Sequence, residues 1–427
     1  MEVFWVANVV AQIFFVKMNS KIMLYYVIIA IVMAEFCYSI FMMYLNHKAS
    51  RRPIPEELSG IYDSNAYKRQ QLYSSVNRRM SVITNVVNTI VSLLIFATGG
   101  YSLIDSVVRE VTDHPVLLTL LFMGVIYLIT LVIDIPFSYY STFVIEERFG
   151  FNKTSRRTFF LDLIKSTLVS MLLTALILST VVVLYELMPR YYWIAAWGAV
   201  MLFTLFIQLF YSDLIVPLFN KQTPLQQGEL RTAIETFAGQ VGFAIKDIYV
   251  MDSSKRSTHA NAYFTGFGPR KRIVLYDTLI EQLTTDEIVG VLAHEIGHYK
   301  HRHQIKGICS YAVTSLMMFF LFNLVIDSPE IAAAAGCDQP SFHINLIVFS
   351  MLYSPIDIVL SMFANINSRR HEWQADEFAK VHGKGVQVAS GLRKMSANSL
   401  SNLTPHPVVV FMEYSHPTLL QRVRHLE

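Results

Sequence analysis

The sequence predicts a mainly α-helical, polytopic membrane protein with seven transmembrane helices and a smaller domain that lies in water. Of the 427 residues, 53% are hydrophobic and only 16% are charged, whereas about 25% of the residues in soluble domains carry charge. The mean hydropathy is positive. Seven long apolar stretches account for this composition, which excludes an ordinary soluble protein.

The predicted spans are runs of about 20 or more mostly apolar residues, the length that a helix needs to cross a bilayer. One such run is also compatible with a buried helix of a soluble protein, but seven are not. The spans cover residues of roughly 22–45, 82–104, 115–142, 160–188, 192–219, 306–326 and 341–366.

Lysine and arginine are unevenly distributed among the connections between these spans. Seven lie between residues 46 and 80 and four between residues 145 and 157, but residues 328–341 contain none. Cytoplasmic loops carry the excess of positive charge in membrane proteins. The first, third and fifth connections and the C-terminal segment are therefore expected in the cytosol, in the endoplasmic reticulum membrane of a eukaryote or the cytoplasmic membrane of a bacterium.

Charge and cysteine content narrow the classes of partner. The formal net charge is only +3, whereas binding to nucleic acid needs a concentrated basic face. The three cysteines, Cys37, Cys309 and Cys337, indicate neither a disulfide framework nor a cysteine metal site. We expect membrane lipid and a peptide or protein substrate as partners, and no nucleic acid. Residues 1–16 are apolar without a cleavage site, as in an interfacial helix or an extension.

The order of the spans divides the chain into four parts. Residues 1–220 form a membrane region with five spans, and residues 304–366 form a hairpin of two spans. Two crossings return the chain to the side from which it started, so residues 221–303 and 367–427 are expected to meet there. Together these two segments predict one catalytic domain.

Two strands and one helix are predicted in the first part of that domain. Residues 247–251 and 272–276 are rich in β-branched and aromatic side chains, and the turn signal Gly266-Phe267-Gly268-Pro269 lies between them. A small β-hairpin or sheet is therefore expected. Thr284 and Glu287 have the spacing of a capping box, which predicts that a helix begins there.

The segment His294-Glu295-Ile296-Gly297-His298 lies on this predicted helix. Residues four apart share one face of a helix, so the imidazoles of His294 and His298 can bind one metal ion. Catalytic zinc with three protein ligands keeps a position for water and lowers the pKa of that water. Glu295 is placed to take its proton, so the segment predicts a zinc hydrolase with one ion per chain.

The third ligand has to come from another part of the chain. His301 and His303 are predicted at the end of the helix, away from the face of His294 and His298. Glu372 follows the last span on a predicted helix, and Asp376 lies one turn further on, where it can orient a ligand imidazole. Without the upstream motif, both carboxylates would be typical of a solvated helix face.

These motifs, in this order, resemble the type I CaaX prenyl endoprotease family of membrane zinc enzymes. The resemblance covers most of the chain. It departs from the family pattern at His371 and Trp373, which flank Glu372 where the family usually shows Phe or Tyr, and the chain is compact beside eukaryotic members. The matching segments are residues 146–152, 217–221, 261–264, 272–279, 294–298, 372–376 and 415–417.

The resemblance implies a seven-helix barrel around a water-filled chamber, capped by a gluzincin-like zinc metalloprotease domain. It implies that Glu372 is the third zinc ligand and that Asp376 supports the site. It also implies that His416 and Arg422 stabilise the oxyanion, and that Asn261 lies on a strand edge that pairs with the substrate backbone. Without the resemblance, His416 predicts only a turn and Arg422 only a surface charge.

Three other classes share parts of this pattern. A heat-shock-type quality-control metalloprotease has the same helix motif but typically fewer spans. A site-2-type intramembrane protease places its motif inside an apolar span, whereas Asp286, Glu287, Lys300 and Arg302 flank this one. A transporter with a structural metal predicts a closed site with four ligands. The CaaX-type protease is the favoured interpretation.

Overall fold

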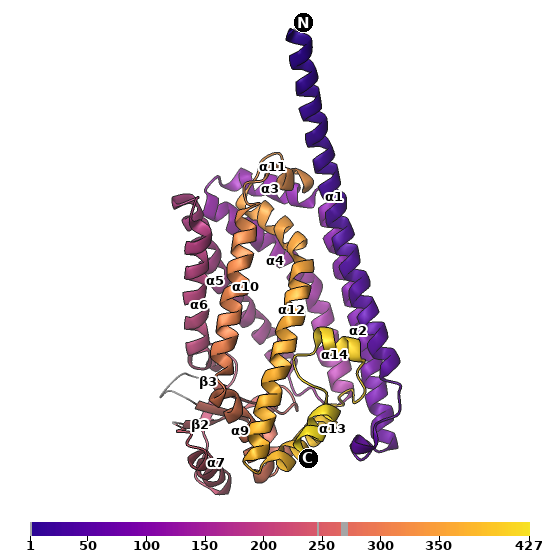
Figure 1. The fold of residues 1–427 in the computed structure, drawn as a ribbon, viewed down its shortest axis with the longest axis vertical. Coiled ribbons are helices and arrows are strands. Elements are labelled where there is room, and N and C mark those ends of the chain that lie inside the picture. The colour runs from indigo at the N-terminus through magenta and orange to yellow at the C-terminus, as the bar shows by residue number, and fades with distance from the viewer. Residues whose placement is uncertain (1, 246, 266–271) are drawn as a thin grey trace.

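The computed structural model describes residues 2–245, 247–265 and 272–427. Long helices run between two ends of the molecule (Figure 1). The short helices α3 and α11 lie at one end, and the sheet, α9 and the C-terminus lie at the other. The predicted turn Gly266-Phe267-Gly268-Pro269 lies outside the described residues.

Seven helices in the described part of the chain are long and apolar enough to cross a membrane, which confirms the predicted number. The third of these helices, α4, continues into a π-helical segment at Ser141–Glu146. The seven are α1 (Glu2–Ala49), α2 (Ser64–Ala97), α4 (Pro115–Tyr140), α5 (Arg156–Leu187), α6 (Tyr192–Leu214), α10 (His303–Asn323) and α12 (Phe342–Val381).

Several predicted boundaries differ from the structure, and two of these differences matter for the fold. The second span was expected at 82–104, but α2 ends at Ala97 and α3 (Gly100–Val111) starts a new direction. Gly99 lies between them with a φ of 73°, the left-handed region that breaks a helix and suits glycine. The last span and the helix of Glu372 are one continuous element, α12, which extends 40 residues.

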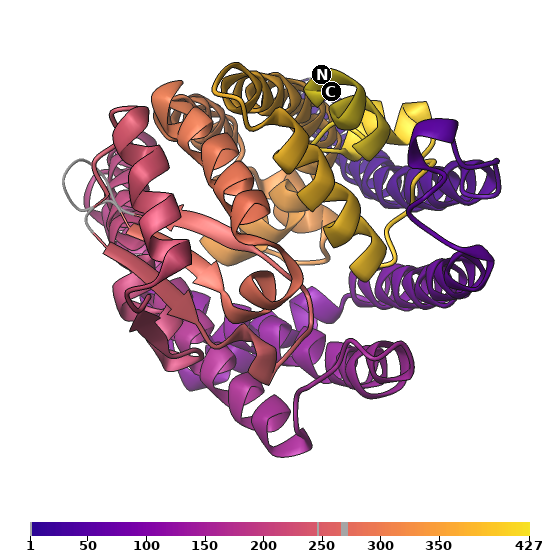
Figure 2. The ribbon, with the colours of Figure 1, turned by 90° about the horizontal axis from the view of Figure 1, so that it is seen from below.

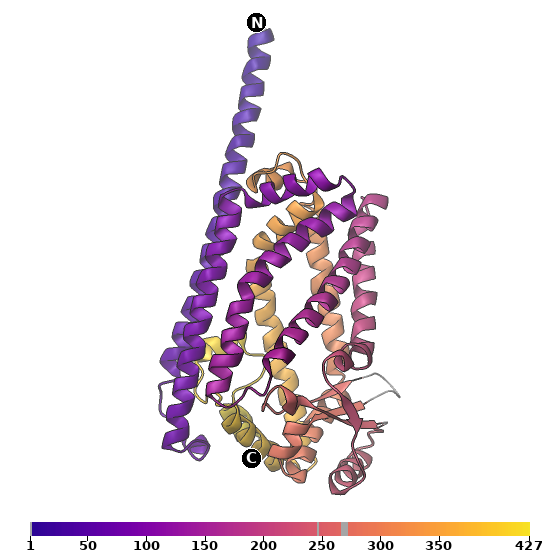
Figure 3. The same cartoon turned by 180° about the vertical axis from the view of Figure 1, so that it is seen from behind.

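The seven long helices form a closed ring. Their order around the ring is α1, α2, α4, α5, α6, α10 and α12, and α12 contacts α1 again. Neighbours in this order contact each other directly, except that α3 and the segment after α4 link α2 to α4. Only 6% to 17% of the most apolar window of each helix is buried. Helices in a solid bundle would bury more, so most of the surface of these helices is not covered by protein; Figure 3 shows α4 and α5 from behind. Close to α3 and α11, α12 also contacts α4 inside the ring.

A four-stranded sheet lies across one end of the ring, as seen from below in Figure 2. The predicted hairpin between the second and fourth strands is wrong, because these two strands pair in parallel. The third strand comes between them in the chain and forms an antiparallel pair with the fourth. The strands are β1 (Gln222–Pro224), β2 (Asp247–Met251), β3 (Ala262–Thr265) and β4 (Arg272–Tyr276), in the order β1-β2-β4-β3.

One apolar core joins the two segments that were expected to meet. Ile248 and Ile273 of the sheet and Ile296 of α9 belong to the same buried cluster as Val388 and Val423 from the C-terminal segment. The remaining helices are α7 (Glu229–Gln240), α8 (Asp277–Gln282), α9 (Thr285–Lys300), α11 (Pro329–Ala334), α13 (Gly385–Asn398), α14 (Pro407–Glu413) and α15 (Leu419–Leu426). Short 3-10 turns lie at Glu56–Leu58, Val216–Leu218 and Ser253–Lys255.

Candidate metal centre

The helix α9 carries the motif and begins as predicted. The Thr284 hydroxyl accepts a hydrogen bond from the Glu287 N–H, and the Glu287 carboxylate accepts one from the Thr284 N–H at 2.8 Å. Ser390 and Lys394 of α13 donate to the same carboxylate at 2.7 and 2.8 Å. Burial would raise the pKa of Glu287, but these donors lower it to about 2. The capping box therefore also attaches α9 to α13.

Two glycines let other helices approach α9 closely. A Cβ atom at Gly297 would lie 2.9 Å from the Cα of Ala375 in α12, and one at Gly290 would lie 2.9 Å from the Cβ of Gln387 in α13. Glycine inside a helix costs about 0.5–1 kcal/mol relative to alanine. The close packing explains its presence, and Gly297 brings α12 to the metal-binding face of α9.

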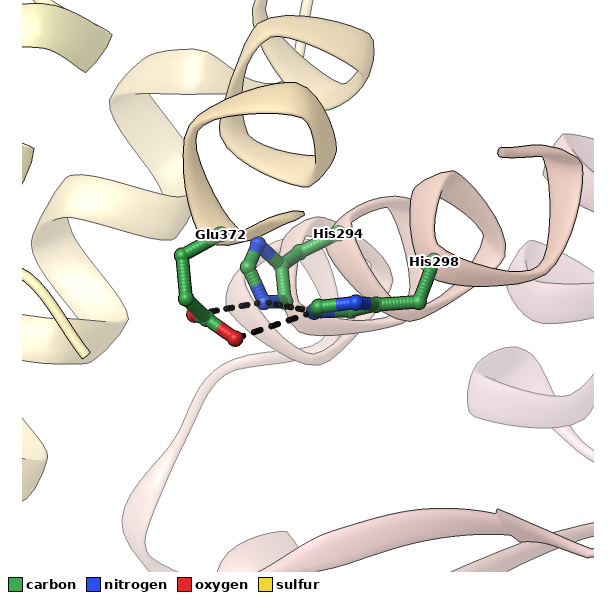
Figure 4. A group of neighbouring side chains, drawn as sticks. All are labelled: His294, His298 and Glu372. Atoms are coloured by element: carbon green, nitrogen blue, oxygen red, sulfur yellow. Dashed lines mark hydrogen bonds and ion pairs between the residues drawn. The ribbon is translucent and has the colours of Figure 1, made fainter. Parts of the chain in front are cut away.

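His294 and His298 of α9 and Glu372 of α12 converge on one point (Figure 4). The two Nε2 atoms are 3.1 Å apart. The Glu372 carboxylate oxygens lie 3.4 Å from Nε2 of His294 and 3.2 Å from Nε2 of His298. The three residues predicted as metal ligands are thus brought together, although Glu372 lies 74 positions after His298 in the chain.

The geometry of these atoms fits a tetrahedral zinc ion. With zinc–ligand distances of about 2.0–2.2 Å, the ligand atoms of a tetrahedral site lie about 3.3 Å from one another, close to the three separations observed. Glu372 is 4% exposed, and its buried Oε2 atom has no hydrogen-bond partner in the described chain. Nη1 of Arg422 lies 3.5 Å from this oxygen, beyond a good hydrogen bond. A buried carboxylate oxygen without a hydrogen bond is costly, and a bound cation would satisfy it directly.

An ionic network supports His294 on the side away from Glu372. Asp376 Oδ1 lies 2.7 Å from Nδ1 of His294, and Arg422 binds the same carboxylate with two nitrogens, at 2.6 and 2.8 Å. Burial alone would lower the pKa of His294, but Asp376 and Glu372 raise it to about 9. A cation binding at Nε2 therefore has to displace a proton from His294.

A neutral chain supports His298. Nδ1 of His298 lies 2.9 Å from Nδ1 of His303, and Nε2 of His303 lies 2.8 Å from Oε1 of Gln374. The Gln374 oxygen accepts, so Nε2 of His303 donates and its Nδ1 accepts the proton of His298 Nδ1. This arrangement directs the Nε2 lone pair of His298 toward His294 and Glu372.

His303 was predicted at the end of the helix, and its role beside the site was missed. Arg302 adopts a left-handed backbone with a φ of 56°, which reverses the chain between α9 and α10. His303, the first residue of α10, is thereby turned back onto His298. It stacks on His371, with ring centroids 4.0 Å apart. A histidine five residues after the motif was the only signal in the sequence.

Glu295 and His416 border a cavity of about 520 Å³ that opens onto His294, His298 and Glu372. His416 is exposed, and its Nε2 lies 3.5 Å from Glu372 Oε1. Arg422 also borders the cavity, but its guanidinium is buried against Asp376. Of the two predicted oxyanion donors, His416 has the freer side chain.

Asn261 lies at the mouth of the same cavity, directly before β3. Its carbonyl accepts a hydrogen bond from the Tyr276 N–H at 3.1 Å. Because β3 is the last strand in the order β1-β2-β4-β3, one of its edges pairs with no other described strand. A second cavity of about 1040 Å³ shares Asn261, Tyr263 and Gln304 with the first and extends between α5, α6 and α10.

Comparisons with known proteins agree with this architecture. Residues 43–221 match the model of the CAAX prenyl protease N-terminal region with five membrane helices, and residues 224–427 match peptidase family M48. The crystal structure of S. mikatae Ste24p aligns with a TM-score of 0.89 and 29% sequence identity, over 95% of this chain and 99% of that chain.

Curated relatives cover nearly the whole chain. The CAAX prenyl protease 1 homologue of Oryza sativa subsp. japonica is 35% identical over 91% of this chain and 94% of its own length. The homologue of Homo sapiens is 31% identical over 88% of both chains. CAAX prenyl protease 1 of Saccharomyces cerevisiae is 31% identical over 92% of this chain and 93% of its own length. With both halves matched, the chain belongs to the CAAX prenyl protease family of M48 membrane metallopeptidases.

Proposed function

We propose that this protein is a zinc-dependent endopeptidase that cleaves C-terminal CaaX-type peptides carrying a prenyl group, or similar substrates. The observation that supports this most directly is the convergence of His294, His298 and Glu372 beside Glu295 at a cavity. We propose these three residues as the ligands of one zinc ion. We also propose that the chain is divided as predicted above, with residues 221–303 and 367–427 forming the catalytic domain and residues 1–220 and 304–366 forming the membrane region.

Zinc, when bound, would polarise the scissile carbonyl and make water a stronger nucleophile. Glu295 takes a proton from the attacking water and passes it to the leaving amine. His416 donates a hydrogen bond to the carbonyl oxygen as negative charge develops on it. Arg422 holds Asp376, and Asp376 in turn orients His294. Because its nitrogens are bound to Asp376, Arg422 stabilises the oxyanion through its positive charge and not through a direct hydrogen bond.

The substrate peptide binds along the free edge of β3, beginning at Asn261, through main-chain hydrogen bonds. The adjoining cavity of about 1040 Å³ is lined mainly by apolar side chains of α5 and α6, among them Ile177 and Phe203. It is contiguous with the cavity of the site through Asn261 and Tyr263. A lipid attached near the cleaved bond would find an apolar compartment there.

The proposed site faces the cytosol. The metal centre lies at the end of the ring where the first connection, rich in lysine and arginine, also lies. In a eukaryote the membrane would be that of the endoplasmic reticulum, and in a bacterium the cytoplasmic membrane.

One experiment tests substrate and chemistry together. The purified protein is incubated with farnesylated and unlipidated forms of one C-terminal peptide, with and without a chelator. We expect chelator-sensitive cleavage that is faster with the farnesylated peptide. Equal cleavage of both forms would contradict the prenyl preference and favour a quality-control protease, while cleavage unaffected by the chelator would contradict the metal mechanism.

The role of Glu295 is tested by Glu295→Gln. This variant retains the zinc ligands but has no base, so we expect bound zinc near one per chain and turnover at least about 100-fold lower. His294→Ala is the matched comparison, because it should lose the metal as well as the activity. Normal cleavage by Glu295→Gln would show that another group takes the proton.

A further inference from the structure

A cavity of about 310 Å³ lies away from the metal centre, between α1, α2 and the segment before α14. Polar side chains from all three elements line it, including Asn46 and His47 of α1, Gln70, Asn77 and Arg78 of α2, and Asn402. No aspartate or glutamate is among the described residues that line it. The cavity is therefore rich in hydrogen-bond donors and has a positive charge.

Arg78 provides that charge without a carboxylate partner. Its Nη1 donates to Nδ1 of His47 at 2.5 Å, and its Nη2 donates to the Ser75 hydroxyl at 3.4 Å. Within the described chain, Arg78 forms no ion pair with aspartate or glutamate. Arg51 and Arg79 act on it as further positive charges. An anion in the cavity would offset this repulsion.

Gln70 points to a ligand independently of Arg78. Its side chain is 2% exposed, and its Oε1 accepts a hydrogen bond from Gln71 at 2.9 Å. Its Nε2 is buried and has no hydrogen-bond partner among the described residues. A buried donor left unpaired is costly, and an acceptor oxygen bound in the cavity would satisfy it.

The cavity lies where two membrane helices change from polar to apolar sequence. The residues of α1 before Asn46 and those of α2 after Ser81 are mostly apolar, whereas residues 47–79 carry all seven lysines and arginines of the first connection. This transition marks the boundary between water and hydrocarbon. Asn402 comes from the C-terminal segment, so the boundary is on the side of the metal centre.

We propose that this cavity binds a phosphate group, with the Arg78 guanidinium and the Gln70 amide as its principal donors. A planar guanidinium is well suited to phosphate oxygens. The group can belong to the headgroup of an anionic lipid in that leaflet or to a soluble phosphate. Because Asn402 donates to Asn46 at 3.3 Å across the cavity, the ligand would connect the C-terminal segment to the first two membrane helices.

The full-length protein in detergent micelles provides the test. Dioleoylphosphatidic acid, dioleoylphosphatidylcholine and inorganic phosphate are titrated separately, and binding is followed by native mass spectrometry and by the shift in unfolding temperature. Saturable binding of phosphatidic acid or of inorganic phosphate supports the site, and the probe that binds identifies its source. If neither phosphatidic acid nor inorganic phosphate bound saturably, the proposal would be overturned.

Two substitutions localise the binding. Arg78→Gln should weaken it about tenfold or more, because it removes a charged donor. Arg79→Gln is the matched control, since Arg79 is the adjacent, exposed arginine and does not line the cavity. Equal losses in both variants would indicate diffuse attraction to the basic loop and would contradict a built site.

Gln70→Met keeps the test valid if Arg78→Gln does not fold. Methionine fills a similar volume and removes the unpaired amide. We expect weaker phosphate binding, with an unfolding temperature in the absence of phosphate no lower than that of the original protein. Unchanged binding in Gln70→Met would exclude Gln70 as a donor.

Discussion

The two histidines of the metal centre are held by different chemistry. His294 is supported by the ionic pair of Asp376 and Arg422, which is buried. His298 is supported by the neutral pair of His303 and Gln374. Both supports accept the Nδ1 proton, so both leave Nε2 free for a cation.

The difference follows from the number of buried charges that the site can balance. A divalent ion would balance Glu372 and Asp376, and Arg422 lies close enough to Glu295 to interact with its charge. A further carboxylate beside His298 would add a buried negative charge without a partner. The neutral support orients the second imidazole without that cost.

Breaking the ionic support should have the largest effect. In Asp376→Asn the buried Arg422 loses its charged partner, which costs roughly 3–5 kcal/mol of unfolding free energy. The hydrogen-bond acceptor for His294 is also weakened, so zinc affinity should fall by up to about 100-fold. Chelator competition measures the affinity, and thermal unfolding measures the stability.

The double variant Asp376→Asn/Arg422→Met separates these two effects. It removes both charges, so much of the stability should return, while zinc affinity stays low. If Asp376→Asn kept the stability and the zinc affinity of the original protein, the proposal that an ionic pair supports His294 would be contradicted.

Breaking the neutral support should have a smaller effect. His303→Phe keeps an aromatic ring against His371 but offers no acceptor to His298, so we expect zinc affinity about tenfold lower and little change in stability. The absorption spectrum of the cobalt-substituted protein should also change, because His298 is no longer oriented.

Two variants at neighbouring positions test the hydrogen bond itself. His303→Asn places an amide oxygen near the Nδ1 position and should recover part of the affinity. His301→Phe changes the imidazole on the other face of His303 and should leave the affinity unchanged. Equal losses in His301→Phe and His303→Phe would indicate a packing role only.

The smallest effect is expected for Glu287→Gln, which removes a charged contact of α9 that is remote from the metal ligands. The donors around Glu287 lower the pKa of that carboxyl to about 2, so it stabilises the fold above about pH 4.5, and this stabilisation is lost as the pH falls toward 2. Lys394 is partly exposed, so Glu287→Gln should cost only about 1–2 kcal/mol at pH 7. Unfolding by denaturant between pH 7 and pH 3 measures how far this difference shrinks.

Glu287→Gln also has a specific control. The exposed carboxylate of Glu281 is close in sequence, and Glu281→Gln should change stability little at any pH. Zinc affinity should be the same in both variants. Lower affinity in Glu287→Gln would mean that the attachment of α9 to α13 also positions the ligands.

Local patterns predicted much of this protein. Seven apolar runs indicated seven membrane helices, and the spacing of His294 and His298 placed two imidazoles on one helix face. The capping box of Thr284 and Glu287 located the start of that helix. Each of these features depends on residues close together in the chain, where helix geometry alone fixes their relation.

The sequence did not predict which strands would pair. The segments at 247–251 and 272–276 were expected to form a hairpin, but they are parallel, and β3 takes the antiparallel place beside β4. Strand pairing depends on the path of the connections through the whole domain. A turn signal between two apolar runs is compatible with either arrangement.

By itself, the sequence determined the helices, the motif and, through its resemblance to a family, the identity of the third ligand. Only the tertiary structure decided that Glu372 reaches the imidazoles, that Arg422 is committed to Asp376 and that His303 supports His298. These contacts join residues on different helices. They depend on the close approach at Gly297 and the left-handed turn at Arg302, and neither can be calculated from the spacing of residues in one helix.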